Sequence, residues 1–154
     1  APQEILSAVK TFPGLPHRQF LVRTLNNIQY INDSKATNAD ATAKALACFD
    51  EIYWIVGGKP KDGGLNGLES FVSKIKKAFL IGAAEDDFAQ WMERNRVPLE
   101  RCGTLDNATQ AARNEAERNG GGVVLLSPAC ASFDQFKNFE HRGEVFTALV
   151  SNFS

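Results

Sequence analysis

The strongest constraint on the fold is a regular alternation of short apolar runs with helical patterns. Four apolar runs of strand length are separated by polar or amphipathic segments; they cover residues 51–56, 78–81, 99–103 and 123–126. Strands that alternate with helices at this spacing are typical of βαβ units, in which the strands are parallel. We therefore predict an α/β fold with a doubly wound, mostly parallel, Rossmann-like sheet and helices on both faces.

The segments around these runs predict the remaining elements. Expected helices cover residues 3–12, 39–49, 68–75, 85–95, 106–119 and 144–150. Asn38 or Thr37 is expected to cap the second of them. Residues 19–25 and 28–31 form an expected antiparallel hairpin, at an edge of the sheet or outside it. Asn26 and Asn27 would make its turn, because asparagine tolerates the left-handed conformation that such turns need.

Length and composition narrow the class of protein. The 154 residues fit a single domain, with residues 1–15 as a linker or starting segment. A net charge of −1 offers no basic excess for nucleic acid. No apolar run approaches the roughly 20 residues that span a bilayer, and no signal-like segment is seen at the start. We expect neither nucleic acid nor membrane as a partner.

The three cysteines are odd in number and lack the spacing of metal ligands. Reduced thiols of a cytoplasmic protein are therefore the expected state, with no metal site. A reactive thiol at Cys130 stays open as an alternative, although the sequence assigns it no histidine partner.

The loops that follow the strands are expected to share one rim of the sheet. Right-handed crossovers would bring together the loops that begin near Asn32, Gly57, Gly82 and Ser127. Open α/β sheets bind their ligands at the carboxyl ends of their strands. We therefore expect the functional site on this rim.

Residues 127–143 make the richest of these loops, with small residues and hydroxyls followed by aromatic side chains. Phe133, Phe136 and Phe139 have helical spacing, so at least two of them are expected to pack in the core. We expect Phe133 and Phe136 mainly to support the loop. His141 is expected to serve structure in a turn at residues 139–143.

Three further segments are expected to place charged side chains on the rim. Residues 32–38 suit either an anion site or a capping turn with solvated charges, and Lys35 and Thr37 would serve the anion. Residues 57–67 lack the spacing of a phosphate loop. They form either a mobile loop that delivers Lys59 or Lys61 to a carboxylate or phosphate, or an exposed glycine loop. Arg18 follows a proline-bounded turn, where its guanidinium suits a phosphate.

Taken together, three blocks of sequence strongly resemble the Mur ligases. They are Leu-Pro-His-Arg at 15–18, Asn-Asp-Ser-Lys-Ala-Thr-Asn at 32–38, and the segment from 125 that contains Ser-Pro-Ala-Cys-Ala-Ser. The resemblance is greatest to the branch that adds D-glutamate, and it covers only the carboxy-terminal third of such an enzyme. It implies an ATP-dependent ligase of peptidoglycan precursor synthesis in the bacterial cytoplasm. Such a ligase forms an acyl phosphate that the amine of an amino acid attacks.

The resemblance also implies roles for individual residues. Arg18 would contact the phosphates of ATP and Asp33 its ribose, while Lys35 would act catalytically beside the transferring phosphoryl group. The residues that would hold D-glutamate are Thr37, Lys61, Ser132, Phe133 and Phe139. Lys61 and Ser132 would hold its side-chain carboxylate, and Lys59 remains an alternative to Lys61.

The implied cofactors and partners lie partly outside this chain. ATP and Mg²⁺ would be bound mainly by a central domain, because the chain has no phosphate loop. UDP-N-acetylmuramoyl-L-alanine would be the acceptor of D-glutamate, and this domain would dock on the central and amino-terminal domains of a monomer. The chain alone is expected to be inactive. The alternatives are a related Mur or folylpolyglutamate-type ligase domain for another amino acid, and a free-standing α/β ligand-binding module.

Overall fold

The computed structural model describes residues 17–154, so the expected helix at 3–12 and the starting segment 1–15 lie outside the described residues. The described part contains six strands, four α-helices and two short 3-10 helices. In chain order they are β1 (Phe20–Leu25), β2 (Ile28–Asn32), α2 (Ala39–Leu46), β3 (Ile52–Gly57), η1 (Glu69–Lys74), β4 (Ile75–Ile81), η2 (Gly82–Ala84), α3 (Glu85–Arg94), β5 (Leu99–Gly103), α4 (Leu105–Arg118), β6 (Gly122–Leu126) and α5 (Phe139–Ser151).

One sheet, in the order β1-β2-β6-β3-β4-β5, forms the centre of the fold. β1 runs antiparallel to β2, and every other neighbouring pair is parallel. The structure therefore confirms the mostly parallel α/β sheet and places the hairpin at its edge. Asn26 and Asn27 make the hairpin turn with φ angles of 54° and 67°, the left-handed conformation that was expected of them.

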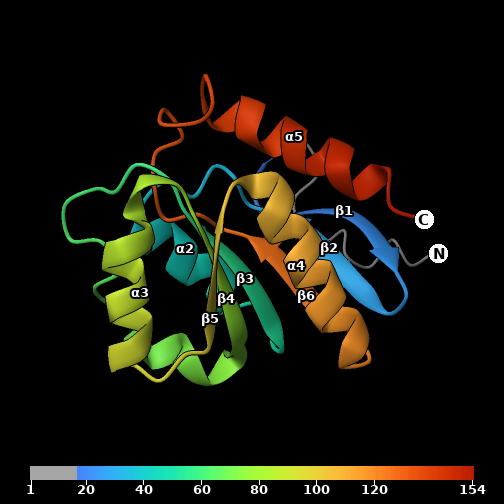
Figure 1. Ribbon diagram of the computed structural model, residues 1–154, viewed down its shortest axis with the longest axis horizontal. Helices are drawn as coiled ribbons and strands as arrows, with labels where there is room; N and C mark the ends of the chain where they lie inside the picture. The colour runs from blue at the N-terminus through green and yellow to red at the C-terminus, as the bar shows by residue number, and fades with distance from the viewer. Residues whose placement is uncertain (1–16) are drawn as a thin grey trace.

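Helices cover both faces of the sheet, as predicted. Along β3, Trp54 belongs to the core cluster that contains the apolar residues of α2 and α3. Tyr53 and Ile55 belong to the cluster under α4 and α5. This division follows from the two-residue period of a strand, and all of β3 is buried because it lies inside the sheet. Figure 1 shows α5, in red, lying along the β1–β2 hairpin, with which it is in contact.

The strand register aligns the carboxyl ends of four strands. Asn32 of β2 and Ile55 of β3 both pair with Leu126 of β6, and Gly57 of β3 pairs with Ile81 of β4. The loops that follow these strands therefore leave from one rim, as the crossover rule predicted.

The closing helix begins earlier than predicted. α5 starts at Phe139 rather than at residue 144, because the Asn138 side chain caps it by accepting a hydrogen bond from the His141 backbone N–H at 2.7 Å. The expected turn at 139–143 is thus helical. Gly143 therefore lies inside the helix. The position requires glycine because an added Cβ atom would overlap the ring of His17.

Three other boundaries differ from the expected ones. The segment expected as a helix at 68–75 is the 3-10 helix η1, and β4 begins at Ile75 instead of at residue 78 because Ile75 pairs with Ile52 of β3. α2 ends at Leu46, three residues before the expected end. None of these differences moves a residue of the rim.

Candidate functional site

Asp33 lies on the rim, directly after β2, and is almost fully buried. Its Oδ1 accepts a hydrogen bond from the Gln19 backbone N–H at 3.0 Å, and its Oδ2 accepts one from the Ser127 hydroxyl at 2.7 Å. Burial raises the pKa of the Asp33 carboxyl to about 7, although these two hydrogen bonds and the charge of Arg18 act to lower it. The carboxylate therefore ties the start of β1 to the end of β6.

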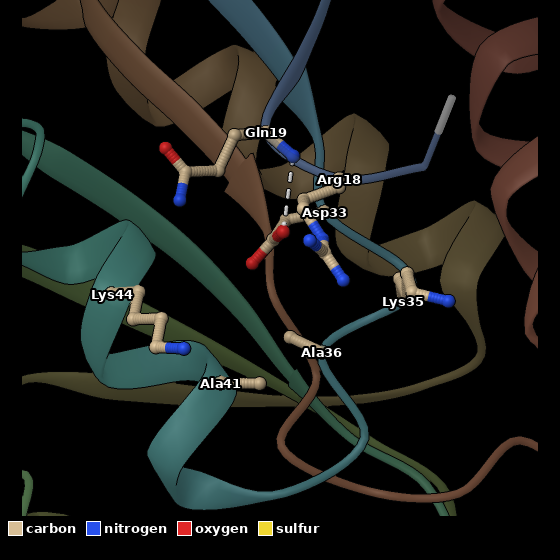
Figure 2. A pocket seen from close by; sticks show the side chains of 7 residues that line it. All are labelled: Arg18, Gln19, Asp33, Lys35, Ala36, Ala41 and Lys44. Atoms are coloured by element: carbon tan, nitrogen blue, oxygen red, sulfur yellow. Dashed lines mark hydrogen bonds between the residues drawn. The ribbon is translucent and has the colours of Figure 1, made fainter. Parts of the chain in front are cut away.

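A pocket of about 140 Å³ opens beside Asp33 (Figure 2). Its lining residues come from the start of β1, the loop after β2, and α2: Arg18, Gln19, Asp33, Lys35, Ala36, Ala41 and Lys44. Three residues with cationic side chains and one with a carboxylate thus line the pocket, and this set suits an anionic ligand such as a phosphate group. The structure brings together Arg18, Asp33 and Lys35, the three residues expected to contact the nucleotide. Lys44 was not expected here.

Lys35 connects this pocket to the 127–143 stretch. Its backbone N–H donates to the carbonyl oxygen of His17 at 2.8 Å, which fixes the loop. Its side chain is exposed, and Nζ lies 4.8 Å from the centre of the Phe139 ring. The His17 ring packs edge-on against Phe139 with 6.3 Å between ring centres. The residue expected at the phosphoryl group therefore contacts a residue expected at D-glutamate.

Arg142 holds the same two loops together from inside the protein, and sequence reasoning missed it. Its guanidinium is buried and donates to three oxygens: Ser34 Oγ at 2.9 Å, the Ser34 carbonyl at 2.7 Å and the Cys130 carbonyl at 3.1 Å. The Ser34 hydroxyl donates in turn to the Phe139 carbonyl at 2.7 Å. Burial lowers the pKa of Arg142 to about 10, so the side chain still carries its charge at neutral pH.

The glycine loop is joined to the 127–143 stretch at its beginning. Lys59 and Ala131 form an antiparallel bridge with N···O distances of 2.9 and 3.1 Å. Gly58 permits this approach, since a Cβ atom there would lie 2.6 Å from the Ala131 carbonyl oxygen. Ala131 immediately precedes Ser132, so the bridge brings the two loops of the expected amino-acid site side by side. The expected mobility of residues 57–67 stays a prediction.

Lys61 lies beyond this bridge, at the amino end of α2. It lines a pocket of about 270 Å³ with Asn38, Asp40 and neighbouring loop residues. Asn38 caps α2, as expected of it or its neighbour, by accepting a hydrogen bond from the Ala41 N–H at 2.9 Å. Thr37 immediately precedes this cap. The structure therefore places Lys61 close to the segment that carries Thr37.

The aromatic residues of the 127–143 stretch have different surroundings. Phe133 is 67% exposed, so the interpretation that it supports the loop from within is wrong. Phe136 packs against the core, as expected, and Phe139 is half-buried. Ser132 is buried, and its carbonyl accepts the N–H of Phe136 at 2.9 Å in a tight turn. This turn leaves Phe133 facing solvent, where it is accessible to a ligand or to another domain.

His141 has the structural role expected of it, although it lies in a helix and not in a turn. Its Nδ1 accepts a hydrogen bond from the Lys137 N–H at 3.1 Å, and its ring packs edge-on against Phe136.

Burial raises the pKa of the Cys130 thiol to about 12, which keeps it protonated and disfavours the reactive-thiol alternative.

Two features are absent from the described residues. Within residues 17–154, no group of three or more His, Cys, Asp or Glu side chains could hold a metal ion. No helix in the same part of the chain is long and apolar enough to cross a membrane.

Several curated proteins with similar sequences share one name. The chain is 54% identical over 155 residues to the UDP-N-acetylmuramoylalanine–D-glutamate ligase of Paramagnetospirillum magneticum, with 99% of this chain and 34% of that protein covered. It is 51% identical to the ligase of the same name from Rhodospirillum rubrum and 53% identical to that from Agrobacterium fabrum, over 96% and 97% of the chain. The chain spans about a third of the length of these relatives. No protein-family profile matches it.

Solved structures show the same fold at low sequence identity. A murein peptide ligase from Psychrobacter arcticus superposes with a TM-score of 0.58 at 13% identity, over 96% of this chain and 32% of that one. The UDP-N-acetylmuramate–alanine ligase of Thermotoga maritima gives a TM-score of 0.57 at 13% identity, over 96% and 33%. These matches confirm the α/β fold.

Proposed function

We propose that this chain, which belongs to the Mur ligase family, is the carboxy-terminal domain of an ATP-dependent ligase that adds D-glutamate to UDP-N-acetylmuramoyl-L-alanine. The observation that carries the proposal is an identity of 50–55% along 92–99% of the chain to ligases named for this reaction. The proposal places the protein in the bacterial cytoplasm as a monomer, acting in peptidoglycan precursor synthesis.

The proposed reaction makes an amide between the amine of D-glutamate and the carboxylate of the acceptor. ATP supplies the phosphoryl group that activates this carboxylate, and phosphate leaves when the amine attacks. Placing an amine against an activated carboxylate is catalysis by position, which a rigid rim can supply. Within residues 17–154, no group of three or more His, Cys, Asp or Glu side chains could hold a metal ion by itself. We propose, as the family resemblance implies, that the central domain of the complete ligase mainly holds the Mg²⁺.

The pocket beside Asp33 is the proposed contact with ATP. Arg18 would bind the phosphates, and this role is supported because Arg18 is exposed and lines the pocket. Asp33 would bind the ribose through lone pairs that Gln19 and Ser127 leave free, since each carboxylate oxygen already accepts one hydrogen bond. Lys35 would stabilise the charge that develops on the transferring phosphoryl group.

The opposite side of Lys35 is the proposed site for D-glutamate. Thr37, Lys61, Ser132, Phe133 and Phe139 would hold it, with Lys61 and Ser132 on the side-chain carboxylate. The bridge between Lys59 and Ala131 and the shared pocket of Lys61 and Asn38 support this grouping, because they bring three distant segments to one place. The pocket at Asn38 favours Lys61 over Lys59, because Lys61 lines it and Lys59 does not.

The test compares the isolated chain with the complete ligase. Phosphate release is measured with ATP, UDP-N-acetylmuramoyl-L-alanine and each of several amino acids. We expect release from the complete ligase with D-glutamate only, and none from the isolated 154-residue chain. Release with a different amino acid would favour the related-ligase alternative. A natural reading frame that starts near Ala1 and carries no ATPase domain would favour the free-standing module.

A further inference from the structure

The pocket beside Asp33 contains a third cation, Lys44, that the proposed function does not use. We infer that Lys44 is a further phosphate-binding residue, which contacts the phosphate chain of the nucleotide from the side opposite Arg18. This inference rests on the proposed function, because it takes the pocket to face ATP in the complete ligase.

The geometry of α2 directs Lys44 towards this pocket. Ala41 and Lys44 are three residues apart on the helix and therefore share a face, and both line the pocket. Figure 2 shows the Lys44 side chain extending from α2 on one side of Asp33, with Arg18 on the other. Ala36 and Ala41 have small side chains, so the space between the two cations stays open.

The charges in the pocket leave Lys44 available for a ligand. Asp33 is the only carboxylate among the lining residues, and no ion pair joins it to Lys44. Lys44 is exposed and forms no ion pair with another residue of the 17–154 part of the chain. Lys35 points away, towards Phe139. Arg18 and Lys44 are therefore the two cations that an anion in the pocket would meet.

The charge of the pocket identifies the part of the nucleotide that Lys44 would contact. Arg18 and Lys44 are cations, and the phosphate chain is the anionic part of the nucleotide. The competing explanation is that Lys44 stands in the last turn of α2 because a cation there interacts favourably with the helix dipole. That explanation predicts no role for Lys44 in nucleotide binding.

The test is equilibrium binding of ADP and of adenosine to the complete ligase, measured by titration calorimetry. Lys44→Gln should weaken ADP binding about three- to tenfold, because it removes one charge-assisted contact at a partly solvated site. Adenosine, which has no phosphate, should bind the variant and the wild type equally. Lys44→Arg should bind ADP within about twofold of the wild type.

Two further variants complete the design. Lys76→Gln removes an exposed cation near the start of β4, at the opposite end of the sheet, and should leave ADP binding unchanged. Ala41→Leu should weaken ADP binding by filling the pocket without a change of charge. The inference is overturned if Lys44→Gln binds ADP as tightly as the wild type does, or if its affinities for ADP and for adenosine fall by the same factor. A wild type that binds ADP but releases no phosphate with D-glutamate would refute the proposed function and leave the role of Lys44 intact.

Discussion

The Nζ atom of Lys35 lies 4.8 Å from the centre of the Phe139 ring, and this contact joins the loop after β2 to the first residue of α5. A cation over an aromatic face is attracted by the ring, so the contact restrains both side chains. In the proposed function, Lys35 serves the phosphoryl group and Phe139 serves D-glutamate. The contact therefore sets the two halves of the reaction next to each other.

The titration of Asp33 predicts a pH-dependent stability. Burial raises its carboxyl pKa from 3.8 to about 7, so the folded state favours the protonated form. The contribution of this group to stability is then complete below about pH 4 and is lost as the pH rises through 7. The Asp33→Asn variant serves as the reference, because the amide at position 33 has no proton to titrate in this range. From about pH 4 to about pH 8, the free energy of unfolding of the wild type should fall by up to about 4 kcal/mol relative to this variant. Urea unfolding across this range measures the difference, and a constant difference would contradict the burial argument.

Arg142 predicts a large loss of stability on substitution. Arg142→Met removes hydrogen bonds to both oxygens of Ser34 and to the Cys130 carbonyl, and it leaves buried oxygens unpaired. We expect a loss of about 3 kcal/mol in the free energy of unfolding. The matched control is Arg118→Met, which breaks an exposed ion pair with Glu115 and should cost less than about 1 kcal/mol. Equal losses for the two variants would show that the buried contacts contribute little.

The contact between the glycine loop and the 127–143 stretch predicts different effects at two glycines. Gly58 has a φ of +134°, and an added Cβ would lie 2.6 Å from the Ala131 carbonyl oxygen. Gly63 also has a positive φ, of +87°, but nothing lies within 4 Å of its added Cβ. Both alanine variants incur backbone strain, and only Gly58→Ala adds a steric overlap. Gly58→Ala should therefore be less stable than Gly63→Ala by at least about 1 kcal/mol in thermal unfolding, and the reverse order would contradict the bridge.

The exposure of Phe133 separates a binding role from a structural one. Because the side chain is 67% exposed, Phe133→Ser should change the free energy of unfolding by no more than about 0.5 kcal/mol. If Phe133 contacts D-glutamate, the same variant should raise the KM for D-glutamate at least about threefold in the complete ligase. Unfolding and steady-state kinetics of one variant therefore test both statements. A loss of stability above about 1 kcal/mol would restore the interpretation that Phe133 supports the loop.

The sequence pattern was sufficient to predict the fold class and the rim. Buried parallel strands appear as short apolar runs, and right-handed crossovers then place the following loops at one edge. The position of β6 between β2 and β3 was not predictable, because its apolar residues would suit any interior strand. The start of α5 was predicted too late, since Gly143 looks like a helix stop. Glycine is required at position 143 instead because the ring of His17 leaves no room for a Cβ atom there, and these two residues are far apart in the chain.

The expected site residues were identified from the resemblance, and the structure adds the residues around them. Arg142 was missed because its segment was expected to be a turn and because sequence gives no signal for a buried guanidinium. Lys44 was missed because it lies inside the helix expected at 39–49, where no motif of the sequence indicated a site. Its approach to Arg18 depends on how α2 packs beside the loop after β2.

The most direct test of the account is the KM for D-glutamate of the complete ligase carrying Lys61→Met, with Lys59→Met as the matched control. If this rim holds the side-chain carboxylate of D-glutamate through Lys61, the first variant should raise the KM for D-glutamate at least about tenfold. Its KM for ATP should stay within about twofold of the wild type, and Lys59→Met should change neither value. A Lys61→Met enzyme with an unchanged KM for D-glutamate would contradict the assignment of this rim to the amino acid.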